Sequence, residues 1–416
     1  MSQDFTPKLI TRLTEGYHLA DFRADALAAM TVAIVALPLS MAIAIASGVR
    51  PERGLYAAIV GGFLVSLLGG SRYQIGGPAG AFIVLVAACA ATTGIEGVIL
   101  ATLMSGVFQI LAGAMRAGTY VRLIPHAVTI GFTAGIALII FITQIKDLLG
   151  LTLGNDPAAV LAKLAALWQG RGTISAASLV VSAATIALIV GFRRFAPKWP
   201  SLLLAVAIVT LIALFLPVET IFQRFGDLPR SPPAPHLPII SADLLQQALP
   251  WALQFTLLGA IESLLSAVVA DSMAGSHHRP NAELIAQGVA NIGSALFGGI
   301  CVTGTIARTA TNVRAGARSP IAGLLHSVFL LIFLLVAAPL AGHIPLAGLA
   351  GVLALVAWDM VERSVIWGIL RQNRAEAAIL IVTFLLVVLR DLSIGIAAGC
   401  VIAALLSWFK RRHAAP

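Results

Sequence analysis

Long apolar runs follow one another along almost the whole chain, separated by short polar or glycine- and proline-containing stretches. A bilayer-spanning helix needs about 20 mostly apolar residues, so most of these runs predict membrane-spanning helices. In the first half the predicted segments are 25–47, 55–68, a broken segment that begins at 76, 98–115, 127–149, 174–192 and 202–216. In the second half they are 249–271, 281–298, a broken segment within 298–318, 321–341, 346–358, 377–388 and 393–409.

The two broken segments occupy matching places in the two halves. In the first, Gly76, Gly77 and Pro78 precede an apolar run that is too short to cross a bilayer as a helix. The second is GGICVTGTIARTATNVRAGAR, at 298–318. Paired, interrupted hydrophobic segments are the best sequence pointer to a transporter's binding site. We therefore predict an all-α polytopic membrane protein of fourteen segments in two repeats of seven, the second inverted because seven is odd.

Composition narrows the class of protein. The chain is 59% hydrophobic and only 11% charged, whereas soluble domains carry about 25% charged residues. This excludes a soluble enzyme and a nucleic-acid partner, and makes the lipid bilayer the surrounding medium. The net charge of +9 is explained by arginines left on the cytoplasmic side, and it favours a topology with both termini in the cytoplasm. The polar N-terminus predicts no cleavable signal peptide.

The same pattern predicts how the chain is divided. A cytoplasmic lead-in is expected at 1–23, the first repeat at 24–216, a proline-rich linker at 217–247, the second repeat at 248–409 and a cytoplasmic stub at 410–416. Residues 155–168 are expected to form a surface helix. The three cysteines lack metal-ligand spacing, and no cofactor is predicted.

The candidate chemistry is an anion site built on the two breaks. Free N–H groups at the start of a helix attract anions, and the first such start falls at Pro78 to Gly80. At the second, Thr305, Arg308 and Thr309 are spaced to share one helix face. Hydroxyls, amides and a guanidinium suit sulfate or a carboxylate. The alternatives are that Arg308 reaches a headgroup or pairs with a buried carboxylate, and that the threonines bond to their own helix.

Glu262 is the acidic candidate, because it lies in the middle of segment 249–271. It is expected either to carry a coupling proton, to hold Arg308 while the site is empty, or to form a fixed buried pair without a role in transport. Two other polar groups are expected to be structural. Glu283, Gln287 and Asn291 form one helical stripe that packs, and the loop with His277 and His278 is solvated rather than a metal site.

Four stretches of the sequence together resemble the sulfate-permease (SulP) family of anion transporters, and the resemblance extends over residues 20–412. They are DFRADALAAMTVAIVALPLSMAIAIASGV with GLYAAIVGGF, QIGGPAGAF, LIPHAVTIGFTAGIAL, and ESLLSAVVADSM through NAELIAQGVANIGSALFGGICVTGTIARTATNVRAGAR. The resemblance implies a uracil-permease-like fold of seven-plus-seven inverted repeats. Segments 1–4 and 8–11 would form a core domain, and segments 5–7 and 12–14 a gate domain. It also implies elevator-type transport, a homodimer and a bacterial inner-membrane location.

The resemblance further implies which residues bind substrate. They are Gly77, Pro78, Ala79, Gly80, Thr305, Ala307 and Arg308, with Glu262 at the family's acidic position. Leu39 and Ala307 depart from the family pattern, since many relatives have polar residues there, so the type of anion stays open. Relatives usually continue into a cytoplasmic STAS domain. We expect this sequence to be the transmembrane domain without it, in a truncated or naturally short form.

These observations favour a secondary active anion transporter, namely a proton-coupled symporter of a fumarate-like dicarboxylate or of sulfate. Sodium-coupled bicarbonate uptake, a passive anion channel and a nucleobase permease of the same fold remain alternatives. The nucleobase alternative predicts two acidic groups at the site, and only Glu262 is found. An intramembrane enzyme would need a nucleophile–base pair or clustered acidic metal ligands at one depth, and the sequence indicates neither.

Overall fold

The computed structural model describes residues 3–119, 125–154, 157, 159–197, 199–390 and 392–413. Small parts of the predicted lead-in, surface helix and C-terminal stub lie outside the described residues, at 1–2, 155–156, 158 and 414–416. Arg122 and Lys198, which contribute to the predicted charge asymmetry, also lie outside them.

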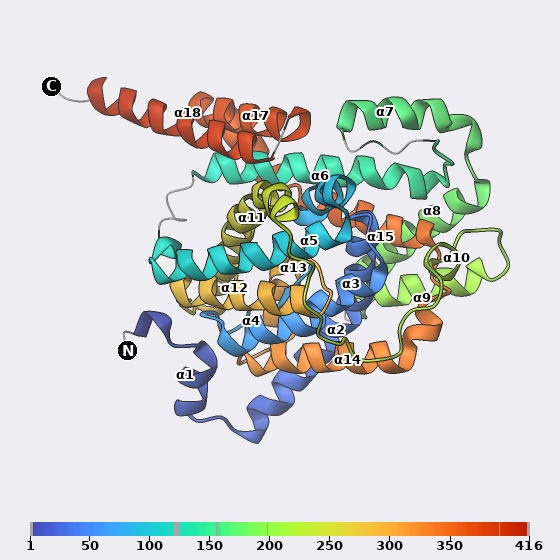
Figure 1. Cartoon of the computed structure of the whole chain (residues 1–416), viewed down its shortest axis with the longest axis horizontal. Helices are drawn as coiled ribbons and strands as arrows, with labels where there is room; N and C mark the ends of the chain where they lie inside the picture. Colours follow the sequence, from blue (N-terminus) through green and yellow to red (C-terminus); the bar gives the residue numbers. More distant parts are fainter. Residues whose placement is uncertain are drawn as a thin grey trace.

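The protein is built almost entirely from helices (Figure 1). The first half contains α1 (Lys8–Thr14), α2 (Leu19–Ala46), α3 (Pro51–Tyr56), the π-helical turn η2 (Ala57–Gly61), α4 (Gly62–Leu68), β1 (Gly76–Gly77), η3 (Gly80–Phe82), α5 (Ile83–Ala114), α6 (His126–Leu149), α7 (Val160–Gln169), α8 (Ala176–Phe195) and α9 (Ser201–Ala213). The second contains α10 (Ile221–Phe225), α11 (Ala242–Ala274), α12 (Pro280–Leu296), β2 (Thr303–Gly304), α13 (Ile306–Arg314), α14 (Ile321–Ala341), α15 (Leu346–Met360), α16 (Arg363–Gln372), α17 (Arg374–Leu389) and α18 (Leu392–His413).

The predicted segments map onto these helices in order. Segments 1–4 are α2, the continuous unit α3–η2–α4, η3 with the start of α5, and the rest of α5; segments 5–7 are α6, α8 and α9. Segments 3 and 4 are separated by Gly94, whose φ of 70° favours glycine and interrupts α5. Segments 8–14 are α11, α12, α13, α14, α15, α17 and α18. The surface helix begins at Val160, later than predicted.

The helices pack into two bodies. In the core domain, α2, α4, α5, α11, α12, α13 and α14 contact one another, and in the gate domain α6, α8, α9, α15, α17 and α18 do so. The two bodies meet where α2 contacts α9 and α15, and where η3 and α5 contact α6. In Figure 1 the gate helices α6, α17 and α18 lie above the core helices. This is the division into core and gate that the sequence predicts.

Helix contacts recur between the halves as an inverted repeat requires. Segment 1 packs on segment 11 (α2 on α14), and segment 8 packs on segment 4 (α11 on α5). Segment 5 packs on segment 13 (α6 on α17), and segment 12 on segment 6 (α15 on α8). The neighbours α8 and α9 likewise correspond to α17 and α18. Each contact therefore has a counterpart with the halves exchanged, which is the signature of a pseudo-twofold axis.

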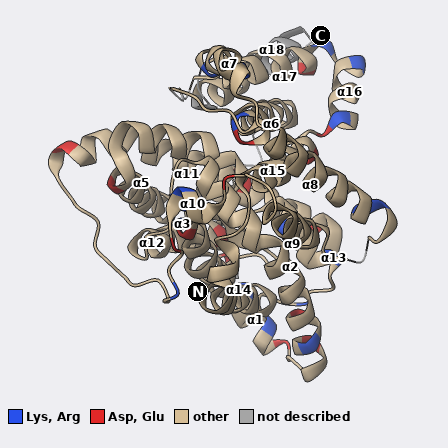
Figure 2. Ribbon diagram, turned by 90° about the vertical axis from the view of Figure 1, so that its right-hand side faces the viewer, with Lys and Arg blue, Asp and Glu red and all other residues tan. Residues whose placement is uncertain are grey.

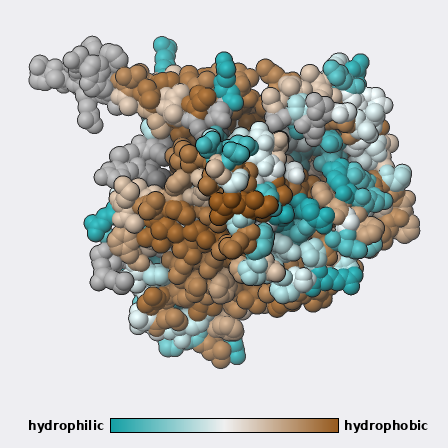
Figure 3. Space-filling view, viewed as in Figure 1, coloured by the Kyte–Doolittle hydropathy of each residue, from teal (hydrophilic) through white to brown (hydrophobic). Residues whose placement is uncertain are grey.

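The surface is that of a membrane protein. Among the described residues, seven helices are long and apolar enough to cross a membrane. The helices of the other segments do not reach that length and hydropathy within the described residues. Apolar side chains cover much of the face in Figure 3, and polar ones gather toward its right-hand end. Charged residues are sparse along the ribbons in Figure 2. Such a surface is stable in lipid and would aggregate in water.

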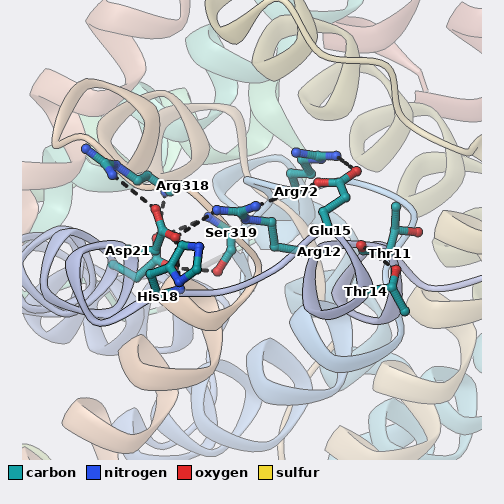
Figure 4. Close-up of polar contacts among 10 residues, drawn as sticks. Thr11, Arg12, Thr14, Glu15, His18, Asp21, Arg72, Arg318 and Ser319 are labelled. Atoms are coloured by element: carbon teal, nitrogen blue, oxygen red, sulfur yellow. Dashed lines mark hydrogen bonds and ion pairs between the residues drawn. The ribbon is translucent and has the colours of Figure 1, made fainter.

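Helix α1 is attached to the core domain by ion pairs (Figure 4). Arg12 donates to Asp21 of α2 at 2.9 Å, and Asp21 also accepts from Arg318, which precedes α14, at 3.0 Å. Glu15 pairs with Arg72, which precedes β1. All of these partners belong to core elements. The N-terminal helix is therefore part of the core domain rather than of the gate.

The polar stripe of α12 packs inward, as the sequence predicts, and its first member holds the loop before β1. Glu283 is fully buried. Its Oε2 accepts from the backbone N–H groups of Gly70 and Ser71 at 2.9 and 3.1 Å. Its Oε1 accepts from the side-chain amides of Gln74 and Gln287 at 2.9 and 2.8 Å. Four donors thus stabilise a buried carboxylate without an ion pair.

The last member of the stripe holds the second break. Asn291 accepts from the N–H of Val302 at 2.8 Å and donates to its carbonyl at 3.0 Å. The same amide donates to Gln109 of α5 at 2.9 Å. Helix α12 thereby supplies hydrogen-bond partners to backbone groups at both chain breaks. Bilayer lipid could not supply such partners.

Replacing Glu283 with glutamine should destabilise the core domain, because an amide NH₂ would face N–H donors that the carboxylate now accepts. We expect a loss of about 3 kcal/mol, from lost hydrogen bonds to a charged group. A thermal unfolding scan in detergent should show a melting temperature several degrees lower. Glu362→Gln, at an exposed position, is the control and should melt as the wild type does. An unchanged melting temperature for Glu283→Gln would contradict this role.

Candidate functional site

The two chain breaks meet in the interior of the core domain and pair with each other. Strand β1 runs antiparallel to β2, with Gly76 opposite Gly304 and Gly77 opposite Thr303. The pairing satisfies backbone groups that two interrupted helices leave open. Glycine is required here by space, since a Cβ on Gly304 would lie 1.7 Å from Nε2 of Gln74. The breaks predicted from Gly-Gly-Pro and the second Gly-rich stretch are therefore one structural unit.

Arg308 lies across this unit, in the first turn of α13. Its side chain is buried, with the residue only 2% exposed. Nη2 donates to Oγ of Ser40 at 3.1 Å and to the carbonyl oxygen of Pro78 at 3.2 Å. Nη1 lies over Gly77, where an added Cβ would stand 2.2 Å away. Ser40 thus joins the predicted site residues and links α2 to it.

The guanidinium of Arg308 is left incompletely paired. Its Nε and Nη1 atoms are buried and have no hydrogen-bond partner. No carboxylate of the described residues lies within ion-pair distance. A buried cation without a counter-charge is costly, so an anion bound against these two nitrogens would be strongly favoured. Of the alternatives for Glu262, a direct ion pair with Arg308 is not formed in this structure.

The hydroxyl groups of Thr305, which caps α13, and of Thr309, within it, bond across to the other break rather than to their own helix. Thr305 donates its hydroxyl to the carbonyl of Ile75 at 3.3 Å, and its backbone N–H donates to the same oxygen at 3.0 Å. Oγ1 of Thr309 accepts from the N–H of Ile75 at 3.1 Å and from Ser266 of α11 at 3.1 Å. Both threonines therefore fix the geometry of the site, and their hydroxyls are already engaged.

The starts of the two half-helices border this unit. Thr305 is the N-cap of α13, yet its side chain does not cap the helix. Ala79 is the N-cap of η3, again without a side-chain cap. The N–H groups that follow each cap are left for another acceptor. Ala307 is exposed, whereas Pro78 and Ala79 are buried, so the site is most open along the first turn of α13.

Glu262 lies on the face of α11 that contacts this unit. Gly259, Glu262 and Ser266 are three and four residues apart, so they share one side of the helix. Gly259 accepts from Thr303 of β2, and Ser266 donates to Thr309 of α13. Glu262 therefore faces the second break, and its Oε2 is buried with no hydrogen-bond partner. A buried carboxyl oxygen without a partner is suited to holding a proton.

The gate domain approaches the site through apolar side chains. A Cβ on Gly80 would lie 3.4 Å from Cδ1 of Ile140 in α6 and 3.8 Å from Sδ of Met360 in α15. Gly80, in the start of segment 3, is therefore a predicted site residue that lies against the gate. Any relative motion of the two domains would change what this end of the site contacts.

The histidine loop differs from the prediction. His278 is not solvated: its side chain is 4% exposed and Nδ1 lies 2.6 Å from Oδ2 of Asp271. Asp271 also accepts from Ser276 and from the backbone N–H of His278, and so caps the turn after α11. In the part of the chain that the structure describes, no three His, Cys, Asp or Glu side chains cluster as metal ligands.

Sequence reasoning missed Ser40 and Ser266. The signal for Ser40 is a serine two residues after Pro38 in an apolar segment. The resemblance to the family instead draws attention to its neighbour Leu39. Leu39 is buried in the apolar core. Ser266 is one of several small polar residues on α11, and only its contact with Thr309 identifies it.

Comparison with known proteins agrees with this fold and site. The Sulfate permease family profile matches residues 22–383. The chain is 43% identical over 392 residues to the "Putative sulfate transporter YvdB" of Bacillus subtilis, covering 94% of this chain and 74% of that protein. It is 33% identical over 412 residues to the bicarbonate transporter BicA of Picosynechococcus sp., covering 95% of this chain and 72% of that protein.

Comparison with solved structures also finds transporters of the same fold. The transmembrane domain of a cyanobacterial bicarbonate transporter BicA superposes with a TM-score of 0.79 at 33% identity, over 91% of this chain and 98% of that one. SLC26A9 superposes with a TM-score of 0.87 at 18% identity, over 97% of this chain and 68% of that one, which shows a shared fold. The chain is a transporter rather than an enzyme, and it belongs to the sulfate permease family of anion transporters.

Proposed function

We propose that the protein is a secondary active transporter that imports a small oxyanion together with a proton. The observation that carries this proposal is the incompletely paired guanidinium of Arg308 at the meeting point of two half-helix starts. The substrate would bind against Nε and Nη1 of Arg308 and the first amides of α13 and of segment 3. Gly77, Pro78, Ala79, Gly80, Thr305, Ala307 and Thr309 would form the rest of the site.

For sulfate or a fumarate-like dicarboxylate, charge balance favours a coupled proton. Arg308 supplies one positive charge, which leaves a bound dianion with one negative charge uncompensated in a low-dielectric site. A proton on Glu262 removes the further negative charge that an ionised carboxylate would add. Glu262 is therefore the proposed coupling residue, since its Oε2 has no other partner.

Sodium-coupled transport of bicarbonate is the second candidate. It is supported by the 33% and 32% identity to two cyanobacterial proteins named as bicarbonate transporters. A monoanion would be neutralised by Arg308 alone, without a coupled proton. The two candidates therefore differ in what Glu262 does, and a test of coupling separates them. A passive anion channel would show no accumulation above the imposed gradient.

The proposed mechanism is an elevator movement of the core domain past the gate domain. It is supported by the location of both half-helices and of Arg308 inside one body, and by the few elements through which the bodies touch. We further propose cytoplasmic termini, a bacterial inner-membrane location and a homodimer, in line with the family. The proposed repeats span 24–216 and 248–409, with the linker at 217–247 between the lead-in 1–23 and the stub 410–416.

Arg308→Ala should lower anion uptake into proteoliposomes by about 100-fold, because truncating one member of a buried charge pair costs several kcal/mol. The measurement is initial uptake of labelled sulfate, fumarate and bicarbonate under imposed proton and sodium gradients. Arg314→Ala, at an exposed position on the same helix, is the matched control and should transport normally. Wild-type rates in Arg308→Ala, for whichever anion the wild type transports, would refute the site.

Gly77→Ala should reduce uptake about tenfold while the protein stays folded, because the added Cβ displaces Nη1 of Arg308. Gly191→Ala is the control, since a Cβ there meets no atom within 4 Å. Both variants should elute as monodisperse protein by size-exclusion chromatography. If Gly77→Ala transports like the control, the position of the guanidinium does not matter for binding.

Glu262→Gln should abolish accumulation driven by an inward proton gradient while counterflow exchange of the same anion continues. Exchange needs the anion site but no net proton movement, so it separates coupling from binding. Asp243→Asn, at an exposed position on the same helix, is the control and should retain proton-driven uptake. If Glu262→Gln still concentrates substrate when the outside is acidified, the proton is carried elsewhere.

A further inference from the structure

Helix α16 carries an exposed stripe of aromatic, apolar and basic side chains that transport does not explain. Arg363, Trp367, Leu370 and Arg371 recur at intervals of three and four residues or lie next to one another, so they share one face. Trp367 is 60% exposed and Leu370 is 37% exposed. Arg363 and Arg371 are exposed as well. Such a face is costly in water because a large indole and a leucine stay uncovered.

The opposite face of α16 is fixed to the protein. Ile369 is buried, and Val365 and Ile366 pack against the hydrophobic core. The helix contacts α6 and α17, which belong to the gate domain. Because one face is held by the gate, the exposed stripe has a fixed direction, away from the protein.

Both arginines of the stripe stack on tryptophans. Cζ of Arg363 lies 4.2 Å from the ring centroid of Trp358, and Cζ of Arg371 lies 5.0 Å from that of Trp367. Trp358 is itself 55% exposed. Neither arginine forms an ion pair with a described carboxylate. An arginine stacked on a tryptophan at a membrane surface combines an aromatic ring suited to the interface with a guanidinium that can bind an anion.

The inverted repeat supplies a matching helix with a different charge pattern. Helix α7, between segments 5 and 6, occupies the place that α16 has between segments 12 and 13, so the two helices lie at opposite ends of the gate. In α7, Trp168 and Leu161 are 69% and 66% exposed, and Arg171 stacks on Trp168 at 4.5 Å. Both helices therefore carry the features of an interfacial anchor.

Only α16 adds a cluster of arginines. Arg193 and Arg194 lie at the end of α8. They are close to α16, because Arg193 pairs with Asp359 of α15 at 2.7 Å. Arg374 follows α16 as the first residue of α17. Segments 13 and 14 cross in turn before the chain ends, so α16 lies on the side of the C-terminus. Each arginine near a membrane surface strengthens binding to anionic phospholipids about fivefold. The charge pattern thus selects anionic lipid for α16 and not for α7.

We propose that α16 lies in the lipid–water interface and binds anionic phospholipid headgroups through Arg363 and Arg371. Trp358, Trp367 and Leu370 enter the acyl region beside these headgroups, and α7 rests in the opposite interface without a preference for anionic lipid. The gate domain is thereby anchored at both surfaces of the membrane. A fixed gate gives the core domain a frame to move against, whichever anion is transported.

The test measures quenching of tryptophan fluorescence by brominated lipids in the full chain reconstituted into nanodiscs. Trp358 and Trp367 are retained and the other tryptophans are replaced by phenylalanine. Two lipid mixtures are compared. One contains 30% brominated phosphatidylglycerol in phosphatidylcholine, and the other contains 30% brominated phosphatidylcholine with unbrominated phosphatidylglycerol and phosphatidylcholine. Quenching should be at least about twofold stronger in the first mixture. The double variant Arg363→Gln/Arg371→Gln should lose this difference and keep the quenching by phosphatidylcholine.

A matched control on the other anchor completes the design. In a chain that retains only Trp168, the two brominated lipids should quench equally, with or without Arg171→Gln. Absence of quenching of Trp358 and Trp367 by either lipid would show that α16 faces water or another protein, and would overturn the proposal. Equal quenching of these two residues by both lipids would overturn the preference for anionic headgroups. Neither readout involves transport, so failure here is distinguishable from failure of the proposed function.

Discussion

The structure depends on one constraint, that backbone N–H and C=O groups inside a bilayer must find partners within the protein. Two helices are broken in the core domain, and each break exposes such groups. The antiparallel pairing of β1 with β2 satisfies some of them, and Asn291 and Glu283 of α12 satisfy others. The amides at the starts of α13 and segment 3 remain for a ligand. The break that costs stability is therefore also the feature that creates the proposed binding site.

Arg308 fits this unit because of what surrounds it. Gly77 leaves room for the guanidinium, and Ser40 and the carbonyl of Pro78 hold one of its nitrogens. Thr305 and Thr309 bond to Ile75, so they brace the two halves of the site against each other instead of contributing free hydroxyls. A rigid frame around a partly unpaired cation is the arrangement expected of an anion site, since the geometry is fixed before the anion arrives. In the proposed mechanism, the ionisable Glu262 is a separate place for a proton.

Much of this could be predicted from the sequence. The Gly-Gly-Pro break and Arg308 were identifiable because glycine, proline and charge are rare in apolar segments and each has a physical cost there. The stripe at Glu283 was also predictable, since its spacing is helical. The Ser40 contact was not, because serine is neutral and common in membrane helices. The sequence could not choose among the alternatives for Glu262, because opposite charges in one sequence do not show whether they meet, and here the side chains of α11 and α13 approach through Ser266 and Thr309. His278 was misjudged because a loop position does not reveal a nearby carboxylate such as Asp271.

The central claim is that Arg308 binds the transported anion directly, and equilibrium binding tests it without any assumption about coupling. Detergent-purified protein would be heated in the presence of sulfate, fumarate, succinate, bicarbonate or chloride, and the melting temperature recorded at each concentration. The account predicts that at least one oxyanion raises the melting temperature of the wild type and of Arg314→Ala, and leaves that of Arg308→Ala unchanged. Equal stabilisation of Arg308→Ala by the same anion would contradict it.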